Sequence, residues 1–436
     1  MSTKTKIAFN TLGCKLNFSE TSSIARSFEE DEYEKVDFSQ KADIYVINSC
    51  SVTKNAEKRC RVLIRQAMRL NPEAYIAVVG CYSQINPEEL ASVPGVKLIL
   101  GNADKYNLHD HIQNLKQKRN EIPLVLNTEK RPKQYHPSYS SDDRTRSFFK
   151  IQDGCDYFCS YCTIPLARGF SRSDTIEGTM KVAREISNSR MREIVLTGVN
   201  IGEFGKQHGE SFYDLLKELV KLPGIDRIRI SSIEPNLLND DIIDLVAVEP
   251  VLMPHFHIPL QSGSDEVLKD MGRRYDTRLF ASRVEKIKKV MPWACVAVDV
   301  IVGFPSEDDK RFQDSYKLME HLPLSYLHVF TYSERDHTRA INLNMSVPVE
   351  IRNDRSKDLH LLSDQKKKVF VMEHMHTERP VLFEKDVSHG YMFGFTDNYL
   401  RVKTPQLPVL ENQIVNVKLE HTDEDLVYYT ENTYLV

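Results

Sequence analysis

The stretch Cys155-Asp-Tyr-Phe-Cys159-Ser-Tyr-Cys162 places three cysteines on one short bend with the spacing C-x3-C-x2-C. Soft thiolate ligands suit iron, and three of them can hold three corners of a cubic [4Fe–4S] cluster. The fourth iron then lacks a protein ligand and can bind a small molecule. The stretch therefore predicts a reactive iron–sulfur site rather than a purely electron-carrying one.

Two other readings of these cysteines are less favoured. Structural zinc needs four ligands, and the next histidine after Cys162 is His208, so no fourth ligand lies nearby in the sequence. A disulfide requires an oxidising compartment. No apolar stretch follows the basic start at residues 1–6, so we expect no secretory signal and a cytoplasmic location, where thiols stay reduced. The eight cysteines are therefore expected to be ligands or core residues, without disulfides.

Length and charge set broad limits. The 436 residues suffice for two or three domains with full cores. The net charge of −4 and the sequence pI near 6.4 do not indicate a general nucleic-acid binder, so any basic surface must be local. The longest apolar run, residues 294–298, is too short to cross a bilayer, and we expect no membrane association.

The first part of the chain, residues 1–126, alternates strand and helix patterns, which predicts a doubly wound parallel α/β sheet. Expected strands are residues 6–11, 43–48, 75–79 and 96–100, and expected helices are residues 19–30, 54–70 and 87–91. Residues 127–146 are polar and contain two prolines, so they are predicted to be a linker.

Residues 147–371 resume the alternation and predict a central partial (β/α)6 barrel, because six strand candidates suit an incomplete barrel better than a closed one. The strand candidates are residues 148–152, 193–197, 227–231, 255–259, 296–301 and 326–331, and a helix is expected near 349–374. Residues 372–436 are rich in Val, Tyr and Phe between turn signals and predict a small antiparallel β-barrel.

A second set of cysteines, Cys14, Cys50 and Cys81, falls just after three of the predicted N-terminal strands. The carboxyl ends of parallel strands meet at one edge of a sheet, so these thiols can converge there. Gly13 and Gly80 would let the backbone approach a bulky cluster closely. Geometry alone leaves the alternative open, because ordinary buried cysteines are common. Two further cysteines, Cys60 and Cys295, lie in apolar patterns and are expected in the core.

The two sets of cysteines, in this order, resemble those of the radical S-adenosylmethionine (SAM) methylthiotransferases. The segments Thr11-Leu-Gly-Cys-Lys-Leu-Asn17 and Cys162-Thr-Ile-Pro-Leu-Ala-Arg-Gly169 resemble the branch that modifies N6-threonylcarbamoyladenosine in tRNA. One departure is the stretch Tyr332-Ser-Glu-Arg335-Asp-His-Thr338, which lacks a glycine that the family often has and leaves the local turn in question.

The resemblance implies a tRNA-modifying transferase with two [4Fe–4S] clusters. One cluster binds SAM, whose reductive cleavage yields a 5′-deoxyadenosyl radical, and the other holds sulfide that a second SAM methylates. The implied reaction is C2 methylthiolation of N6-threonylcarbamoyladenosine at position 37, 3′ of the anticodon. The implied partners are a tRNA anticodon stem-loop and a reductant protein such as flavodoxin or ferredoxin, and the implied C-terminal part is a TRAM domain.

Polar residues near the ends of the predicted barrel strands are candidate SAM contacts, since barrel active sites form at that edge. A glycine-containing strand end is also often just a turn. The candidates are Thr197, Gly198, Asn200, Glu234, Gln261, Ser262 and Asp299.

Two surfaces are candidates for RNA binding. The predicted helix 54–70 carries Lys54, Lys58, Arg61, Arg65 and Arg69 at steps of three and four, which keeps them on one face, and Glu57 is the only acid in that stretch. Such a face suits the phosphates of an anticodon stem, although a simple solvated face is the alternative. In the C-terminal segment Tyr399, Arg401 and Lys403 are candidates, yet residues 373–436 hold five Lys and Arg against eleven Asp and Glu.

Two other functions stay open at the level of sequence. The first is a methylthiotransferase that modifies a ribosomal protein aspartate, which a protein mass shift without any tRNA change would reveal. The second is a non-catalytic RNA-binding iron–sulfur protein, which SAM cleavage on reduction would exclude.

Overall fold

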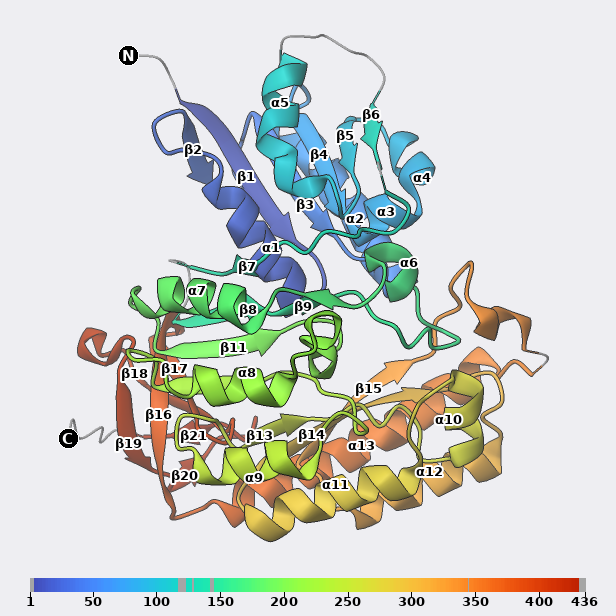
Figure 1. Cartoon of the computed structure of the whole chain (residues 1–436), viewed down its shortest axis with the longest axis vertical. Coiled ribbons are helices and arrows are strands. Elements are labelled where there is room, and N and C mark those ends of the chain that lie inside the picture. Colours follow the sequence, from blue (N-terminus) through green and yellow to red (C-terminus); the bar gives the residue numbers. More distant parts are fainter. Residues whose placement is uncertain (1–3, 117–122, 128, 142–144, 344, 431–436) are drawn as a thin grey trace.

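Figure 1 shows an N-terminal α/β part above a larger central part, with the C-terminal strands at one end of the central part. The structure is a computed structural model, and it describes residues 4–116, 123–127, 129–141, 145–343 and 345–430. Three parallel sheet segments and one mainly antiparallel sheet carry most of the core.

The N-terminal part is built on a six-stranded parallel sheet in the order β2-β1-β3-β4-β5-β6. All six residues of β3 are buried, because helices cover both faces of the sheet. Its strands are β1 (Thr5–Thr11), β2 (Tyr33–Val36), β3 (Ile44–Ser49), β4 (Tyr75–Gly80), β5 (Val96–Leu100) and β6 (Leu124–Leu126). Its helices are α1 (Lys15–Arg26), α2 (Lys54–Leu70), α3 (Cys81–Ile85), α4 (Pro87–Ala91) and α5 (Leu108–Lys116), with the 3-10 turn η1 (Lys105–Asn107).

The parallel sheet that the sequence predicted is therefore confirmed, with local differences. The helix expected at residues 19–30 is α1, which begins at Lys15 because Cys14 is its N-cap and ends at Arg26. The strands β2 and β6 and the helix α5 were not predicted, since the two strands are short and β2 is half charged.

The segment expected to be a linker, residues 127–146, is in part ordered against the central part. Within it, β7 (Ser138–Tyr139) pairs antiparallel with β8 (Arg146–Lys150). The Tyr135 hydroxyl also donates a 2.6 Å hydrogen bond to the carbonyl oxygen of Lys150. Backbone pairing at a sheet edge needs little apolar side-chain surface, so the polar sequence conceals it.

The central part contains two sets of parallel strands. Strands β8, β11 (Glu193–Thr197) and β12 (Arg227–Ile230) form one set, and β13 (His255–His257), β14 (Cys295–Val302) and β15 (Tyr326–Thr331) form the other. Parallel bridges from Ile228 to Leu252 and from Ser232 to His257 connect the two sets. The remaining strands are β9 (Gln152–Asp153) and β10 (Arg172–Ser173).

Helices cover these strands on the outside (Figure 1) and build the largest apolar core of the described residues with them. The described helices of the central part are α6 (Ile164–Arg168), α7 (Ile176–Ser187), α8 (Phe212–Leu219), α9 (Asp240–Val248), α10 (Asp265–Met271), α11 (Thr277–Val290), α12 (Asp309–His321) and α13 (Val349–Glu373), with the 3-10 turns η2 (Ile201–Glu203), η3 (Lys206–His208) and η4 (Arg339–Asn342). Among the described helices, none is both long enough and apolar enough to cross a membrane.

The C-terminal strands form a six-stranded sheet in the order β19-β16-β17-β18-β21-β20. Every pairing in it is antiparallel except β18 with β21, which is parallel. The strands are β16 (Glu378–Ser388), β17 (Tyr391–Thr396), β18 (Arg401–Pro405), β19 (Ile414–Lys418), β20 (His421–Thr422) and β21 (Tyr428–Tyr429), with the 3-10 turn η5 (Pro408–Leu410). Its apolar core includes Cys295 of β14, so the sheet packs on the central part, and Cys60 is fully buried in the N-terminal core. Both cysteines are core residues, as predicted.

Candidate active site

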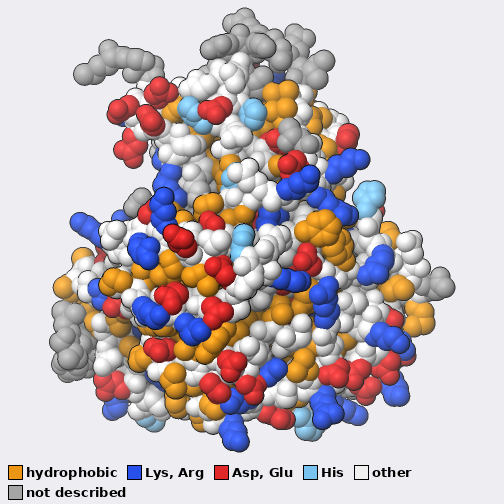
Figure 2. Space-filling view, in the orientation of Figure 1, with side chains coloured by type: hydrophobic (Ala, Val, Ile, Leu, Met, Phe, Trp, Pro, Cys, Tyr) orange, Lys and Arg blue, Asp and Glu red, His pale blue; other side chains and the backbone are white. Residues whose placement is uncertain are grey.

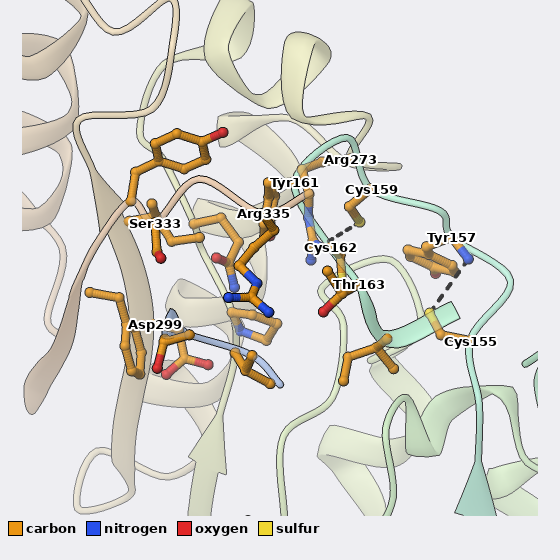
Figure 3. A pocket seen from close by; sticks show the side chains of 18 of the residues that line it. Cys155, Tyr157, Cys159, Tyr161, Cys162, Thr163, Arg273, Asp299, Ser333 and Arg335 are labelled. Atoms are coloured by element: carbon orange, nitrogen blue, oxygen red, sulfur yellow. Dashed lines mark hydrogen bonds between the residues drawn. The ribbon is translucent and has the colours of Figure 1, made fainter. Parts of the chain in front are cut away.

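Three cysteines converge on one wall of a cavity of about 330 Å³ in the central part. Figure 3 shows Cys155, Cys159 and Cys162 on the same side of this cavity, with Asp299 and Ser333 across from them. The loop that carries them leaves β9 through Gly154, which has φ +71°. A Cβ added to Gly154 would lie 2.0 Å from the carbonyl oxygen of Phe170, so no other residue fits this turn.

The environment of these thiols suits a metal cluster. Burial raises the pKa of Cys162 to about 12 and raises the pKa of Cys155 and of Cys159. The Arg273 guanidinium donates a hydrogen bond to the Cys159 sulfur at 3.2 Å. Three converging thiols that are neutral without a ligand become thiolates when a metal binds, so the donor set fits a [4Fe–4S] cluster.

Three of the candidate SAM residues line the same cavity as these cysteines: Glu234, Gln261 and Asp299. Gln261 has φ +63°, a left-handed conformation that non-glycine residues keep mainly where the surroundings impose it. Burial raises the pKa of Glu234, and an ion pair with Arg273 opposes that rise.

The other four candidates, Thr197, Gly198, Asn200 and Ser262, are not among the residues that line this cavity. Gly198 packs against Gln152, where an added Cβ would lie 2.9 Å from the backbone oxygen. The Ser262 hydroxyl lies 3.2 Å from the Ser315 hydroxyl of α12. Their role as SAM contacts stays a prediction, and the neighbouring Val199 and Ser232 line the cavity in their place.

Several residues of the cavity wall were not among the candidates from the sequence. Tyr157 and Tyr161 belong to the cysteine stretch itself, so their place beside the cysteines was available from the sequence. Arg273 follows α10 as part of a short charged run, which carries no local signal for a contact with Cys159. Arg335 lines the cavity and forms a buried ion pair with Glu57 of α2, and this pair joins the N-terminal part to the central part.

The second set of cysteines lies at one edge of the N-terminal sheet, as predicted. Cys14 follows β1, Cys50 follows β3, and Cys81 follows β4 as the first residue of α3. Burial, and then the neighbouring Cys81 and Cys14, raise the pKa of Cys50 to about 12, so the three sulfurs influence one another. Gly13 has φ +99°, and a Cβ there would lie 3.0 Å from the Cys50 sulfur. This donor set also fits a [4Fe–4S] cluster.

A buried network of charges lies beside this second set. Arg168 of α6 bonds to Asn17, Glu20 and Asp153 at distances of 2.5 to 3.0 Å. The remaining ion pairs of the network link Lys105 and Lys150 to Glu20, and Lys150 and Arg172 to Asp153. Burial alone would raise the pKa of the Glu20 carboxyl, but Arg168 and the two lysines hold it well below its usual range.

The network touches the second set of cysteines directly. The Asn102 side-chain amide lies 3.7 Å from the Cys81 sulfur and donates a 2.8 Å hydrogen bond to the Ala167 carbonyl oxygen. Burial opposes the charged form of Arg168, but Cys81 is the largest of the influences that raise its pKa well above the usual value. Residues of α6 thus lie beside the second set although they follow the first set in sequence.

The basic face of α2, defined as Lys54, Lys58, Arg61, Arg65 and Arg69, is less uniform than the sequence suggested. Four of the cations are exposed, but Arg61 is half-buried and pairs with Glu89 of α4. Figure 2 shows Lys and Arg side chains gathered on the N-terminal part at the level of α2 to α4. RNA binding by this face remains a prediction.

The three C-terminal candidates for RNA binding lie in different environments. The Tyr399 ring stacks on Phe395, with centroids 4.7 Å apart, and lies beside His255 of β13. Tyr399 therefore faces the central part, whereas Arg401 is exposed and Lys403 pairs with Asp423.

Two parts of the chain match known protein families, and most of the chain is similar to named relatives. Residues 6–101 match the uncharacterized protein family UPF0004, and residues 149–319 match the radical SAM superfamily. The chain is 40% identical over 423 residues to threonylcarbamoyladenosine tRNA methylthiotransferase MtaB of Bacillus subtilis (strain 168), covering 95% of this chain and 93% of that protein. It is 37% identical over 399 residues to the protein of the same name from Thermotoga maritima, covering 91% and 90%.

A solved structure shows a similar fold. It is that of TsrM from Kitasatospora setae, a radical S-adenosylmethionine methyltransferase, with a TM-score of 0.55 and 13% identity over 75% of this chain and 73% of that chain.

Proposed function

Because the chain belongs to the threonylcarbamoyladenosine tRNA methylthiotransferase family, we propose that it converts N6-threonylcarbamoyladenosine at position 37 of tRNA into its 2-methylthio derivative. The observation that carries this proposal is the pairing of two sets of three cysteines, one in each of the first two parts of the chain. A single set would supply a radical site but no separate place for sulfur.

The residues divide the work between the two sites. Cys155, Cys159 and Cys162 would hold the cluster that binds SAM. The second set, Cys14, Cys50 and Cys81, would hold the other cluster. When bound, the two clusters and SAM supply hydrogen abstraction and sulfur transfer, while the protein binds, orients and insulates the reacting groups.

The cavity residues have roles that follow from their positions. Glu234 is held in place by Arg273, which also contacts Cys159, so it can orient a polar end of SAM beside the cluster. Gln261 and Asp299 offer further polar contacts from the opposite wall. The rings of Tyr157 and Tyr161 line the wall next to the cysteines and exclude water from it.

The finer architecture is part of the proposal. The two sets of parallel strands and the bridges between them suit a partial (β/α)6 barrel, and the C-terminal sheet suits a TRAM domain. We place the domains at residues 1–126, 147–371 and 372–436, with residues 127–146 as the linker between the first two. A flavodoxin or ferredoxin would supply electrons, and the basic face of α2 would hold the anticodon stem.

The test combines iron content with tRNA analysis. Anaerobically reconstituted protein should carry about eight irons, and replacing either set of three cysteines with Ala should remove about half. The variant that lacks Cys14, Cys50 and Cys81 should still cleave SAM, whereas the variant that lacks Cys155, Cys159 and Cys162 should not. Cys60→Ala is the matched control and should keep all its iron, because Cys60 is a core residue.

Mass spectrometry of tRNA nucleosides tests the reaction itself. Cells that express the protein should gain 2-methylthio-N6-threonylcarbamoyladenosine, and both triple variants should fail to produce it. If the variant that lacks Cys14, Cys50 and Cys81 keeps all its iron, the proposal of a second cluster is wrong. If cells that express the wild-type protein show an unchanged nucleoside profile, the proposed substrate is wrong.

A further inference from the structure

Asn102 is a buried asparagine beside the second cysteine set. It follows Gly101 at the end of β5, and it is only 4% exposed. Its backbone amide donates a 2.8 Å hydrogen bond to the side-chain oxygen of Gln84 on α3, the helix that begins with Cys81. The backbone of Asn102 is therefore fixed relative to the helix that carries this cysteine.

The partners of the Asn102 side chain fix which end of its amide points where. The Lys105 ammonium donates a 2.8 Å hydrogen bond to the amide oxygen, and an ammonium cannot accept one. The amide nitrogen donates a 2.8 Å hydrogen bond to the Ala167 carbonyl oxygen, which cannot donate. Both contacts require the same orientation, so exchange of the oxygen and the nitrogen would break both hydrogen bonds.

The amide nitrogen in this orientation also faces the Cys81 sulfur, at a distance of 3.7 Å. An amide nitrogen carries two hydrogens, and the Ala167 carbonyl oxygen accepts one of them. The other hydrogen is available to the sulfur. A cysteine that binds a metal is a thiolate, and a charged acceptor forms a stronger hydrogen bond than a neutral one. Asn102 can therefore donate to a ligand of the second cluster.

A second asparagine of the site turns the opposite end of its amide to a cysteine. The Asn17 side-chain oxygen lies 4.0 Å from the Cys14 sulfur, while its nitrogen donates to the carbonyl oxygens of Leu12 and Ser49 at 2.8 and 3.2 Å. An amide oxygen cannot donate a hydrogen bond to a thiolate. A polar side chain beside the second set thus need not be a donor to it, and the orientation of Asn102 is specific.

The packing of the central part on the N-terminal part maintains this orientation. Ala167 belongs to α6, which lies against α3 (Figure 1). Lys105 forms a buried ion pair with Glu20, and Arg168 of α6 pairs with the same carboxylate. Residues of α6 therefore supply one contact of the Asn102 amide directly and support the other through Glu20.

We propose that Asn102 is a positioning residue that raises the reduction potential of the second cluster through its hydrogen bond to the Cys81 thiolate. This inference rests on the proposed function, which assigns a [4Fe–4S] cluster to Cys14, Cys50 and Cys81. Reduction adds negative charge to the cluster, so a donor to one of its sulfurs stabilises the reduced state more than the oxidised state. The contact that joins the two parts of the chain thus also sets how readily the sulfur-carrying cluster accepts an electron.

The test is a redox titration of the anaerobically reconstituted full chain, followed by electron paramagnetic resonance. The signal of the second cluster is the one that disappears when Cys14, Cys50 and Cys81 are replaced by Ala. Asn102→Leu removes the donor and keeps a similar volume. The equilibrium constant for one-electron reduction of the second cluster should fall about tenfold, the lower end of typical outer-shell effects. This corresponds to a potential about 59 mV lower, while the potential of the first cluster stays the same.

Two further variants separate tuning from damage to the fold. Asn102→Asp keeps the shape and a partner for Lys105, which holds the new carboxyl ionised, but it replaces the donor by an acceptor. The added negative charge should lower the potential of the second cluster more than Asn102→Leu does, with full iron content. Asn398→Leu is the matched control, because Asn398 is also buried and donates to a backbone carbonyl oxygen, that of Trp293 at 2.9 Å, but lies in the C-terminal sheet. Both potentials should match wild type in this control.

An unchanged potential of the second cluster in both Asn102 variants would overturn this inference and leave the proposed function intact. Equal shifts of both clusters, or a shift in Asn398→Leu, would also overturn it, because they would indicate general loosening of the protein. If wild-type protein gives only the signal of the first cluster, and the variant without Cys14, Cys50 and Cys81 keeps all its iron, the proposed function fails instead.

Discussion

Replacing Arg168 with Gln should loosen the junction between the N-terminal and central parts. The Arg168 side chain is almost fully buried and donates four hydrogen bonds, one to Asn17, two to Glu20 and one to Asp153. Three of these four bonds cross from the central part to α1. A glutamine side chain is shorter and uncharged, so it cannot replace them.

The size of the effect follows from what stays paired. Removing one partner of a buried ion pair costs about 3–5 kcal/mol. In Arg168→Gln, Glu20 keeps Lys105 and Lys150, and Asp153 keeps Lys150 and Arg172, so no carboxylate is left alone. We therefore expect a loss at the lower end of this range. The free energy needed to open the junction should fall by about 3 kcal/mol.

Hydrogen exchange measures this opening without requiring two-state unfolding of the whole chain. The amides of α1 should exchange about 100-fold faster in Arg168→Gln than in wild type, since each 1.4 kcal/mol is a factor of ten. Arg184→Gln, an exposed residue of α7, is the control and should change exchange by less than about twofold. An Arg168→Gln protein with wild-type exchange in α1 would show that desolvation of the guanidinium already offsets its ion pairs.

Three further outcomes are expected. Changing Arg65 and Arg69 to Glu should weaken tRNA binding and lower the slope of log affinity against log salt by up to about 0.9 per lost phosphate contact, and an unchanged slope would place the RNA elsewhere. Glu57→Gln, which breaks the buried pair with Arg335, should speed hydrogen exchange in α2 by a factor that corresponds to about 3 kcal/mol, and wild-type exchange would contradict this. Burial, and then nearby cations, lower the pKa of His136 from 6.5 to about 4. The folded state therefore favours the neutral ring, and the stability that this preference contributes is fully present above about pH 6.5. It is lost as the pH falls toward 4. After discounting for partial exposure, thermal unfolding of His136→Phe should lack about 1–2 kcal/mol of this acid sensitivity, and equal sensitivity in both proteins would refute the assignment.

The convergence of Cys14, Cys50 and Cys81 was predictable from sequence. It needed only the strand pattern and the rule that parallel strands end at one edge, and both hold here. The pairings of the charged residues were not predictable in this way. Glu20 and Arg168 are 148 residues apart, and Arg61 finds Glu89 on another helix. Sequence shows which residues carry charge, but the docking of separate elements decides which charges meet.

Backbone conformation shows the same limit on a smaller scale. The missing family glycine near Arg335 put the local turn in question, yet the turn forms because His337 adopts φ +67°. The Thr338 amide donates a 3.3 Å hydrogen bond to the Arg335 carbonyl oxygen within it. A left-handed residue other than glycine costs about 1–2 kcal/mol. The buried Arg335–Glu57 pair supplies a tertiary contact able to hold such a turn, and no local sequence pattern contains that information.

The short segment after Cys162 fixes the two cysteine sets relative to each other. Helix α6 begins two residues after Cys162, and the intervening Thr163 contacts the Ser51 carbonyl oxygen, next to Cys50. The helix ends at Arg168, whose guanidinium lies within the network beside Cys81. One stretch of seven residues, 162–168, thus touches both sites. Removal of hydrogen and delivery of sulfur must occur at the same carbon of the base, so a rigid and buried connection between the sites keeps both groups aimed at one point.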